Sequence, residues 1–359
     1  MKTEHILVIR FSALGDVAMT VPVIAALARQ YPHVRITMLS RGFARPFFEG
    51  LAPNVSFMEA DVKVEYRGFK GLNALYRRLT AKNFTAIADL HDVLRSQYLR
   101  VRFDLGRYKV AHINKHRADR RKLVSASHKV LKPLPSPFDN YAEVFARLGY
   151  PVRLDPGFSL KGRFELSEDR VAALRADRGA PEHGALLIGI APFAAHQGKI
   201  YPLQLMEKVV AGLCERHPDA RLFLFGGGEK EMEVFHEWTA KYAQCVTVGD
   251  HLSGLREELA LMERLNVMIS MDSANMHFAS LVALPVVSVW GATHPYAGFM
   301  GYGQSPENAV HIDLPCRPCS IYGQKPCMRG DWACMQNISP EQIISKVETV
   351  ILTKNRKTL

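Results

Sequence analysis

The sequence has no long uninterrupted hydrophobic run. Its longest apolar stretch, Phe278 to Ala292, is shorter than the ~20 residues that a membrane-spanning helix needs, and Pro285 interrupts it. The start also lacks the pattern of a secretory signal, because Glu4 and His5 precede an apolar stretch of only Ile6 to Ile9. We therefore expect the protein to stay in the cytoplasm.

Recognised DNA- and RNA-binding motifs are absent as well, although the chain carries a formal net charge of +11. Much of that charge is local, because nine Lys or Arg residues and one acid, Asp119, lie between Arg107 and Lys132. Such a stretch is either a solvated basic surface or a contact for phosphates, acidic sugars or anionic lipid headgroups. Without a nucleic-acid motif, we expect no nucleic-acid partner.

Short-period repeats and low-complexity tracts are also lacking, so 359 residues predict two ordinary domains. Short apolar runs alternate with helical patterns along the chain, which is typical of βα units and parallel sheets. The helical patterns of the first half include Val17–Gln30, Leu72–Lys82 and Tyr141–Leu148. The apolar runs are continuous, as in strands that are covered on both faces. We expect strands at Ile6–Arg10, Arg35–Leu39, Val55–Met58, Ala86–Leu90 and Lys109–Ile113, and then at Leu186–Ala191, Arg221–Phe225, Val246–Val248, Val267–Ser270 and Val286–Trp290.

A segment punctuated by Pro and Gly, Pro151 to Gly184, separates the two halves, and we place the domain boundary near Arg163. The expected domains are residues 1–163 and 164–338. Residues 339–359 form a terminal helix that Ser339 can cap and Pro340 can begin. Its apolar side chains form one stripe: Ile343, Ile344, Val347, Val350 and Ile351. This helix could pack back toward the N-terminal domain.

The first candidate loop follows the first strand, because ligands of parallel sheets bind beyond the carboxyl ends of the strands, where helix N-termini offer unpaired N–H groups. It runs from Arg10 to Asp16 and has no G-x-G-x-x-G spacing, so a dinucleotide fingerprint is absent. Gly15 permits a tight turn, and Asp16 stands at the start of a helix. Its carboxylate is either a simple helix cap or an ionised group that can accept a proton.

Loops of the second half have the composition of a diphosphate site. Ala191–Pro202 is rich in small residues, and Lys199 within it is either an ordinary exposed lysine or a cation for a diphosphate. Asp272 and Ser273 precede an apolar helix whose N-terminus suits a phosphate. His277, one turn into that helix, is either a core residue or a further hydrogen-bond donor.

Two more loops are expected at the same sheet edge. Gly291 to Pro295 is rich in small residues, and Glu229 follows three glycines at a place where a carboxylate could hold ribose hydroxyls. Together, the loops predict an acid in one half and a diphosphate-binding sheet edge in the other.

These motifs resemble those of glycosyltransferase family 9, the ADP-heptose:lipopolysaccharide heptosyltransferases, over nearly the whole length. The chain differs from the usual family pattern in having Ser273-Ala274 in place of Thr-Gly, and Ala194 and Ala195 in place of hydroxyl residues. The matching segments are Ser12–Val17, then Asp89–His91 with Arg95 and Ser96, and then Asp272–His277 with Pro285 and Gly291–Thr293.

The resemblance implies a GT-B fold, with two Rossmann-like α/β domains facing a central cleft, the donor in the C-terminal domain and the acceptor in the N-terminal one. It implies an inverting enzyme without a catalytic metal that moves a heptose or related sugar from ADP-heptose, or a similar nucleotide sugar, to the lipopolysaccharide inner core. Asp16 would be the general base, and Lys199 would stabilise the leaving group. The other donor-binding residues would be Glu229, Asp272, Ser273, Ala274, His277, Gly291 and Thr293, and the acceptor-binding residues Ser12, Gly15, Arg95, Arg117, Arg120 and Arg121.

The implied acceptor is an acidic, lipid-linked oligosaccharide. This gives the basic stretch between Arg107 and Lys132 a role, and it suggests peripheral contact with the inner membrane surface through charge.

Four of the six cysteines cluster near the end of the chain. In a cytoplasmic protein they are either reduced thiols that pack a loop or ligands of a structural zinc. Only the first pair has the C-x2-C spacing of a paired zinc site. The four are Cys316, Cys319, Cys327 and Cys334.

Two other functions stay open at this point. One is an epimerase-like GT-B enzyme acting on nucleotide sugars, which would need further acids and histidines in the cleft. The other is a non-catalytic protein that binds sugar nucleotides or lipid headgroups, which would have no use for a base opposite the diphosphate.

Overall fold

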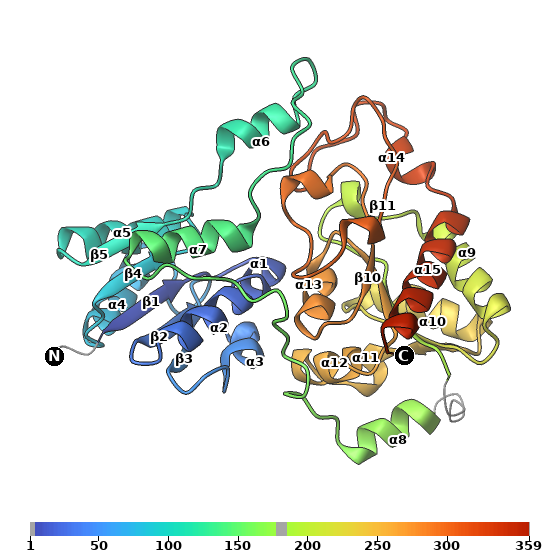
Figure 1. The fold of residues 1–359 in the computed structure, drawn as a ribbon, viewed down its shortest axis with the longest axis horizontal. Helices are drawn as coiled ribbons and strands as arrows, with labels where there is room; N and C mark the ends of the chain where they lie inside the picture. The colour runs from blue at the N-terminus through green and yellow to red at the C-terminus, as the bar shows by residue number, and fades with distance from the viewer. Residues whose placement is uncertain (1–3, 177–184, 359) are drawn as a thin grey trace. The chain divides into compact units, whose positions relative to one another are not determined.

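The computed structural model describes residues 4–176 and 185–358 (Figure 1). Contacts divide the chain into two compact units. Unit 1 contains Met1–His116 and Pro135–Gly157, and unit 2 contains Arg117–Leu134 and Phe158–Leu359. The sequence assigned all of residues 1–163 to one domain, whereas the contacts of Arg117–Leu134 group this segment with unit 2.

Unit 1 is built on a parallel sheet with the strand order β3-β2-β1-β4-β5. The chain moves outward from β1 to β3 and then crosses to β4 on the other side of β1. The loops that follow β1 and β4 therefore meet at the switch point of the sheet, where α/β proteins bind their ligands. The strands are β1 His5–Ile9, β2 Arg35–Ser40, β3 Val55–Glu59, β4 Ala86–Asp89 and β5 Lys109–His112.

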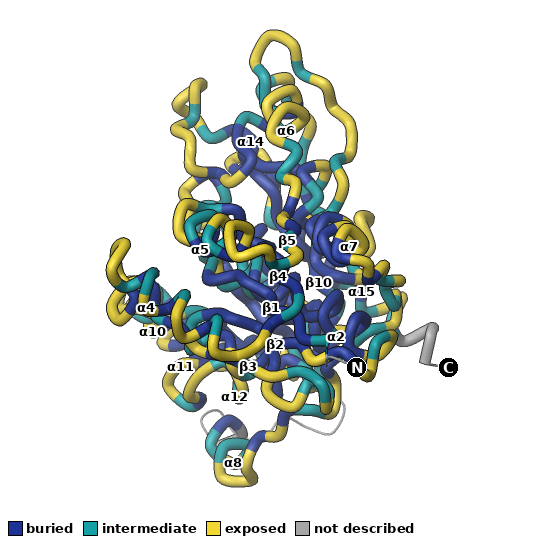
Figure 2. The backbone as a smooth tube through the Cα atoms, turned by 90° about the vertical axis from the view of Figure 1, so that its left-hand side faces the viewer, coloured by how far each residue is buried: buried dark blue, intermediate teal, exposed yellow. Residues whose placement is uncertain are grey.

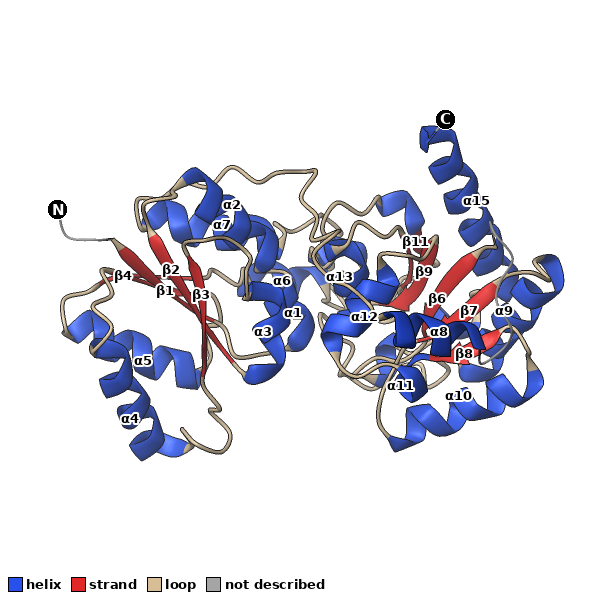
Figure 3. Ribbon diagram, turned by 90° about the horizontal axis from the view of Figure 1, so that it is seen from below, coloured by secondary structure: helices blue, strands red, loops and turns tan. Residues whose placement is uncertain are grey.

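Helices cover both faces of this sheet, with α4 and α5 on one face and α2 and α7 on the other (Figure 3). Leu75 and Leu79 of α4 and Leu99 and Phe103 of α5 are buried in the core of the first face. The helices are α1 Leu14–Ala18, α2 Val21–Gln30, α3 Arg45–Phe48, α4 Gly68–Thr80, α5 Leu94–Leu105 and α7 Pro137–Arg147, with a 3-10 turn, η1, at Gly42–Ala44.

One helix expected from the sequence is divided in the structure. The apolar pattern predicted a single helix from Val17 to Gln30, but α1 ends at Ala18 and α2 begins at Val21. Pro22 lies in the first turn of α2, where its missing N–H is no loss, whereas inside a continuous helix it would remove a backbone hydrogen bond.

Unit 2 repeats the architecture with a six-stranded parallel sheet of order β11-β10-β9-β6-β7-β8. The switch point lies between β6 and β9, so the loops after these two strands meet at one edge. The strands are β6 Leu187–Ala191, β7 Arg221–Leu224, β8 Cys245–Thr247, β9 Val267–Met271, β10 Val286–Val289 and β11 Ala309–Val310.

The ten strands predicted from the sequence are all present, and each end lies within one residue of its expected position. The two-residue strand β11 was missed, because so short a run has no periodicity.

Helices connect the parallel strands of unit 2. The right-handed crossovers of parallel strands place helices on both faces of the sheet. Further 3-10 turns are η2 Gln197–Lys199, η3 Pro295–Ala297 and η4 Pro306–Asn308. The helices are α6 Arg117–Leu123, α8 Glu168–Ala176, α9 Leu203–Arg216, α10 Glu229–Lys241, α11 Val248–His251, α12 Leu255–Met262, α13 Ala274–Leu281, α14 Ala333–Gln336 and α15 Pro340–Thr358.

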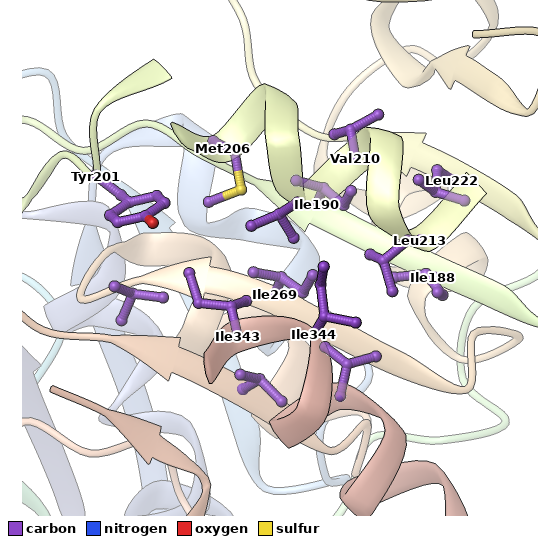
Figure 4. Close-up of a cluster of buried hydrophobic side chains, with 14 of the residues drawn as sticks. Ile188, Ile190, Tyr201, Met206, Val210, Leu213, Leu222, Ile269, Ile343 and Ile344 are labelled. Carbon is purple, nitrogen blue, oxygen red and sulfur yellow. The ribbon is translucent and has the colours of Figure 1, made fainter. Parts of the chain in front are cut away.

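The main core of unit 2 lies between the sheet and the helices α9 and α15 (Figure 4). Ile343 and Ile344 of α15 pack with Met206 and Leu213 of α9 and with Ile269 of β9. This is the apolar stripe that the sequence showed in the terminal helix. The possible return of this helix to the N-terminal domain stays a prediction.

Burial follows the sheets, whose strands are mostly buried, while exposure concentrates on the outer helices and the loops (Figure 2). Within the described ranges, no helix combines the length and apolar character that crossing a bilayer requires.

Candidate active site

The loop after β1 holds the predicted base in a defined place. Asp16 lies in the first turn of α1, and its Oδ2 accepts a hydrogen bond from the backbone N–H of Ala13 (3.2 Å). The same oxygen lies 2.8 Å from Nη2 of Arg10. The Arg10 side chain is 8% exposed, whereas that of Asp16 is 31% exposed. The carboxylate thus acts as a helix cap and is also ion-paired and open to solvent.

Arg10 is fixed from the far side of its guanidinium. Its Nη1 donates to the carbonyl oxygen of Leu90 (2.5 Å), and its guanidinium lies 5.7 Å from the ring centroid of Tyr141 in α7. The Tyr141 hydroxyl in turn donates to the backbone oxygen of Asp16 (3.4 Å). Arg10 thus places a positive charge, held by two further contacts, directly beside the Asp16 carboxylate.

His91 completes the unit 1 edge from the loop after β4. Its ring nitrogens lie 3.4 Å from the backbone N of Phe11 and 3.4 Å from the Ser12 hydroxyl. Burial, followed by the positive charge of Arg10, lowers the pKa of His91 to about 3. The imidazole is therefore neutral near neutral pH.

Asp89 shapes the loop that carries His91. It is fully buried, and its Oδ1 accepts hydrogen bonds from the backbone N–H groups of His91 and Asp92 (both 2.9 Å). Arg100 of α5 lies 3.2 Å from its other oxygen. The Asp89–His91 motif is thus a turn that presents a histidine.

The predicted acceptor-binding residues fall in different places. Ser12 and Gly15 lie in the loop and first turn beside Asp16, and Arg95 is exposed at the second residue of α5. Arg95 also contributes to lowering the pKa of His91, which places its charge near the same edge.

The three arginines of α6 lie in unit 2. Arg120 packs against it, because its guanidinium lies 5.3 Å from the ring of Phe299 and donates to the Tyr322 hydroxyl (2.7 Å). Arg117 and Arg121 are exposed on the same helix.

The unit 2 edge brings together Lys199, from the loop after β6, and Asp272, from the loop after β9. The Lys199 ammonium lies 2.8 Å from Oδ2 of Asp272. The lysine side chain is 14% exposed and the aspartate side chain 3% exposed. The predicted convergence of these two loops is present, and the lysine is its accessible member.

Close backbone packing holds the Lys199 loop against the loop after β10. The N–H of Ala292 donates to the carbonyl oxygen of Gly198 (2.9 Å), and the N–H of Gly198 donates to that of Gly323 (3.2 Å). A Cβ at Gly198 would lie 2.7 Å from the Gly323 oxygen, and one at Gly291 would lie 2.8 Å from the Gly198 oxygen. Larger residues would therefore force these loops apart.

The helix α13 begins beside this pair. Ser273 is its N-cap with extended backbone, and its hydroxyl lies 3.3 Å from that of Ser270. Ala274 is the first helical residue, and His277 is buried one turn later. Thr293 is fully buried, and its hydroxyl finds no hydrogen-bond partner within the described structure.

Glu229 is the exposed first residue of α10, directly after the glycine loop that follows β7. Glu231, for which no role was predicted, accepts a hydrogen bond from the backbone N–H of Gly227 (2.9 Å).

The cysteine cluster does not form a ready-made metal site. All four thiols are free, and no three of the described ones bring their sulfur atoms within 4.8 Å of one another. The group that meets this distance is His294, His311 and Asp313. Nη1 of Arg317 lies 2.9 Å from Nδ1 of His311, so a guanidinium faces that group and opposes a cation. A zinc bound by the thiols stays a prediction.

Comparison with known proteins decides the class of the molecule. The model of glycosyltransferase family 9 (heptosyltransferase) matches residues 72–327, which is well over half of the chain. The chain belongs to glycosyltransferase family 9. It is therefore a glycosyltransferase, and the family expected from the motifs is confirmed. Of the alternatives, neither the epimerase nor the non-catalytic binding protein is favoured.

Relatives and solved structures agree with this assignment. Lipopolysaccharide heptosyltransferase 1 of Pseudomonas aeruginosa is 24% identical, over 97% of this chain and 98% of that protein. A glycosyltransferase family 9 structure from Veillonella parvula has a TM-score of 0.70 at 20% identity and covers 98% of both chains. The E. coli heptosyltransferase WaaC with ADP has a TM-score of 0.60 at 18% identity, over 85% of this chain and 94% of that one. The expected GT-B fold is confirmed.

Sequence reasoning missed two residues of the unit 1 edge. Arg10 was read only as the start of the loop, and His91 only as part of a motif. The available signal was topological, since residues that directly follow β1 and β4 must meet at the switch point.

Proposed function

We propose that this glycosyltransferase moves a heptose from ADP-heptose to the inner core of lipopolysaccharide. Its relative from Pseudomonas aeruginosa is a lipopolysaccharide heptosyltransferase, and WaaC, which shares the fold, was solved with ADP. The observation that carries the proposal is the partly exposed Asp16 carboxylate, held on Oδ2 by Arg10 and by the N–H of Ala13.

Asp16 is the proposed general base of an inverting displacement. An acceptor hydroxyl oxygen attacks the anomeric carbon of the donor sugar while its proton passes to the Asp16 carboxylate. The bond between the anomeric carbon and the diphosphate oxygen breaks, and ADP leaves with the electron pair. Arg10 keeps the carboxylate in one place through this step, so it is a positioning residue.

Unit 2 is proposed to stabilise the departing ADP. Lys199 neutralises charge on the diphosphate, and the backbone N–H groups of Ser273 and Ala274 bind phosphate oxygens at the positive end of α13. Asp272 holds the lysine in place when no donor is bound. His277 and Thr293 complete this side, with Glu229 near the adenosine.

The acceptor is proposed to be the acidic, lipid-linked core. Arg95 lies at the unit 1 edge, and the exposed Arg117 and Arg121 supply further positive charge from α6. Peripheral contact with the inner membrane surface follows from an acceptor that is anchored in lipid.

The variant Asp16→Asn tests the proposal. It keeps the side-chain shape and removes the proton acceptor, so turnover with ADP-heptose and acceptor should fall by roughly 100- to 10,000-fold. Donor affinity, measured by calorimetry, should stay close to that of the wild type. Asp219→Asn, at an exposed position in unit 2, is the matched control. Transfer by Asp16→Asn at the normal rate would end the proposal.

A further inference from the structure

Helix α5 in unit 1 has an apolar side chain at every turn of its outer face. Leu94, Val101 and Leu105 are 85%, 53% and 76% exposed. Together with the half-buried Tyr98, they are spaced at i, i+4, i+7 and i+11, which places them on one side of a helix. Its opposite side, with Leu99 and Phe103, is buried against the sheet. Exposed apolar side chains that follow one another along a helix are the kind of surface that marks an interaction site.

The neighbouring helix α4 extends this face. Its second residue, Phe69, is 74% exposed, and its ring centroid lies 5.5 Å from that of Tyr98. Arg102 of α5 donates to the side-chain oxygen of Asn73 in α4 (2.7 Å), which fixes the two helices side by side (Figure 3). We call Phe69, Leu94, Tyr98, Val101 and Leu105 the α5 stripe.

The two helices that carry the α5 stripe have an excess of positive charge. Helices α4 and α5 together contain six Lys or Arg residues and one acid, Asp104. Lys70, Arg77, Arg78 and Arg95 are exposed among them. An apolar stripe with flanking cations is the pattern of a helix that lies in the headgroup region of an anionic bilayer.

We infer that the α5 stripe docks unit 1 onto an anionic lipid surface. A second copy of this chain is disfavoured as the occupant, because a symmetric contact would bring the cations of two copies together. The inference rests on the proposed function for its choice of a lipid partner, since a lipid-linked acceptor keeps the enzyme at a membrane. Arg95 at the second residue of α5 links this face to the edge that holds Asp16 and His91.

Vesicle binding by the full chain tests the inference. The probes are phosphatidylcholine vesicles with and without about 30% phosphatidylglycerol, a fraction that gives a negative surface potential. We expect the wild type to float with the anionic vesicles. The double variant Val101→Ser/Leu105→Ser should lower the partition coefficient by about tenfold or more. Lys70→Gln/Arg77→Gln should lower it by roughly 10- to 30-fold, an effect that added salt also produces.

Leu352→Ser is the matched control, because Leu352 is 62% exposed on α15 in unit 2, and this variant should bind as the wild type does. Val101→Glu/Leu105→Glu, checked for an unchanged thermal unfolding midpoint, is the second variant of the stripe. Unchanged flotation of both stripe variants would overturn the inference. Failure of the wild type to float with anionic vesicles would also overturn it. So would a stripe variant that changes only self-association in sedimentation.

A water-soluble, delipidated core saccharide separates this inference from the proposed function. The stripe variants should transfer sugar to it at the wild-type rate and show a raised KM only for the acceptor in vesicles. If the wild type transfers to neither acceptor while flotation still depends on the stripe, the proposed function fails and the docking surface stands. If the stripe variants lose transfer to the soluble acceptor as much as to the acceptor in vesicles, the stripe contacts the saccharide and the inference fails.

Discussion

The two sheet edges present opposite charges built from the same kind of pair. In unit 1, the arginine of the Arg10–Asp16 pair is the buried partner and the carboxylate faces solvent. In unit 2, the aspartate of the Lys199–Asp272 pair is the buried partner and the ammonium is the more exposed one. At each edge, therefore, the more exposed charged group is paired with a buried counter-ion.

This difference matches the two halves of a sugar transfer. A base must accept a proton, so an accessible carboxylate suits the acceptor side. A diphosphate leaving group gains charge as its bond breaks, so an accessible cation suits the donor side. We propose that the buried partners, Arg10 and Asp272, act by holding the accessible groups in position.

Replacing the accessible lysine of the unit 2 pair should have a larger effect on turnover than replacing the buried arginine of the unit 1 pair. Lys199→Met removes the cation for the diphosphate, and turnover should fall by roughly 100- to 1,000-fold. It also leaves the buried Asp272 carboxylate without its ion-pair partner, at a cost of about 3 kcal/mol in the free energy of unfolding. Steady-state kinetics and urea unfolding measure the two effects.

A second variant separates these effects. Lys199→Met/Asp272→Asn removes both charges, so stability should largely recover while turnover stays low. Lys208→Met, at an exposed position of α9, is the control. Recovery of turnover in the double variant would show that Lys199 acts only by balancing Asp272.

Much of this comparison could be predicted from the sequence, but not the pairs themselves. Continuous apolar runs located ten strands. Because ligands of parallel sheets bind beyond the carboxyl ends of the strands, the loops that contain Asp16, Lys199 and Asp272 could be selected as well. The pairing of Arg10 with Asp16 could not be predicted, because it depends on Leu90 and Tyr141, which lie far along the chain.

The basic segment shows the limit of local reasoning more clearly. Its charge was evident, but its location was not. Residues 117–134 join unit 2 because Arg120 packs on Phe299 and Tyr322 and because Lys129 donates to the carbonyl oxygen of Pro318 (2.9 Å). Nothing in the composition of the segment specifies these distant partners. The exposed stripe of α5 was missed for a related reason, since a helix with two apolar faces gives no sign of which one is outside.

Replacing the buried arginine of the unit 1 pair should have a smaller effect on turnover and a distinctive signature. Arg10→Gln frees the Asp16 side chain, and turnover should fall by roughly 10- to 100-fold through loss of position. Because the positive charge of Arg10 lowers the pKa of His91 and the negative charge of Asp16 raises it, Arg10→Gln should raise that pKa and Asp16→Asn should lower it. Titration of the His91 ring by NMR distinguishes the two directions. A pKa that moves with neither variant would mean that the edge is not electrostatically coupled.

The last effect concerns stability rather than turnover, at His294 of unit 2, a buried histidine like His91. Burial, followed by the charge of Arg317, lowers the pKa of His294 from 6.5 to about 4. Below pH 6.5 the unfolded chain binds a proton at His294 that the folded chain does not bind. The contribution of neutral His294 to stability is therefore fully present above that pH and falls as the pH drops toward 4. The loss should approach about 1.4 kcal/mol per pH unit within this window.

The variant His294→Asn isolates this contribution, since an asparagine oxygen can still accept the Tyr296 N–H that the ring Nδ1 now binds (3.0 Å). All three tryptophans, Trp238, Trp290 and Trp332, lie in unit 2, so their fluorescence during urea unfolding reports on this unit. We expect the midpoint of His294→Asn to fall less steeply between pH 6.5 and pH 4 than that of the wild type, whereas His128→Asn, at an exposed position, should keep the wild-type slope. Equal slopes in all three proteins would mean that folding does not lower the pKa of His294. The two edges would then resemble each other only in their ion pairs.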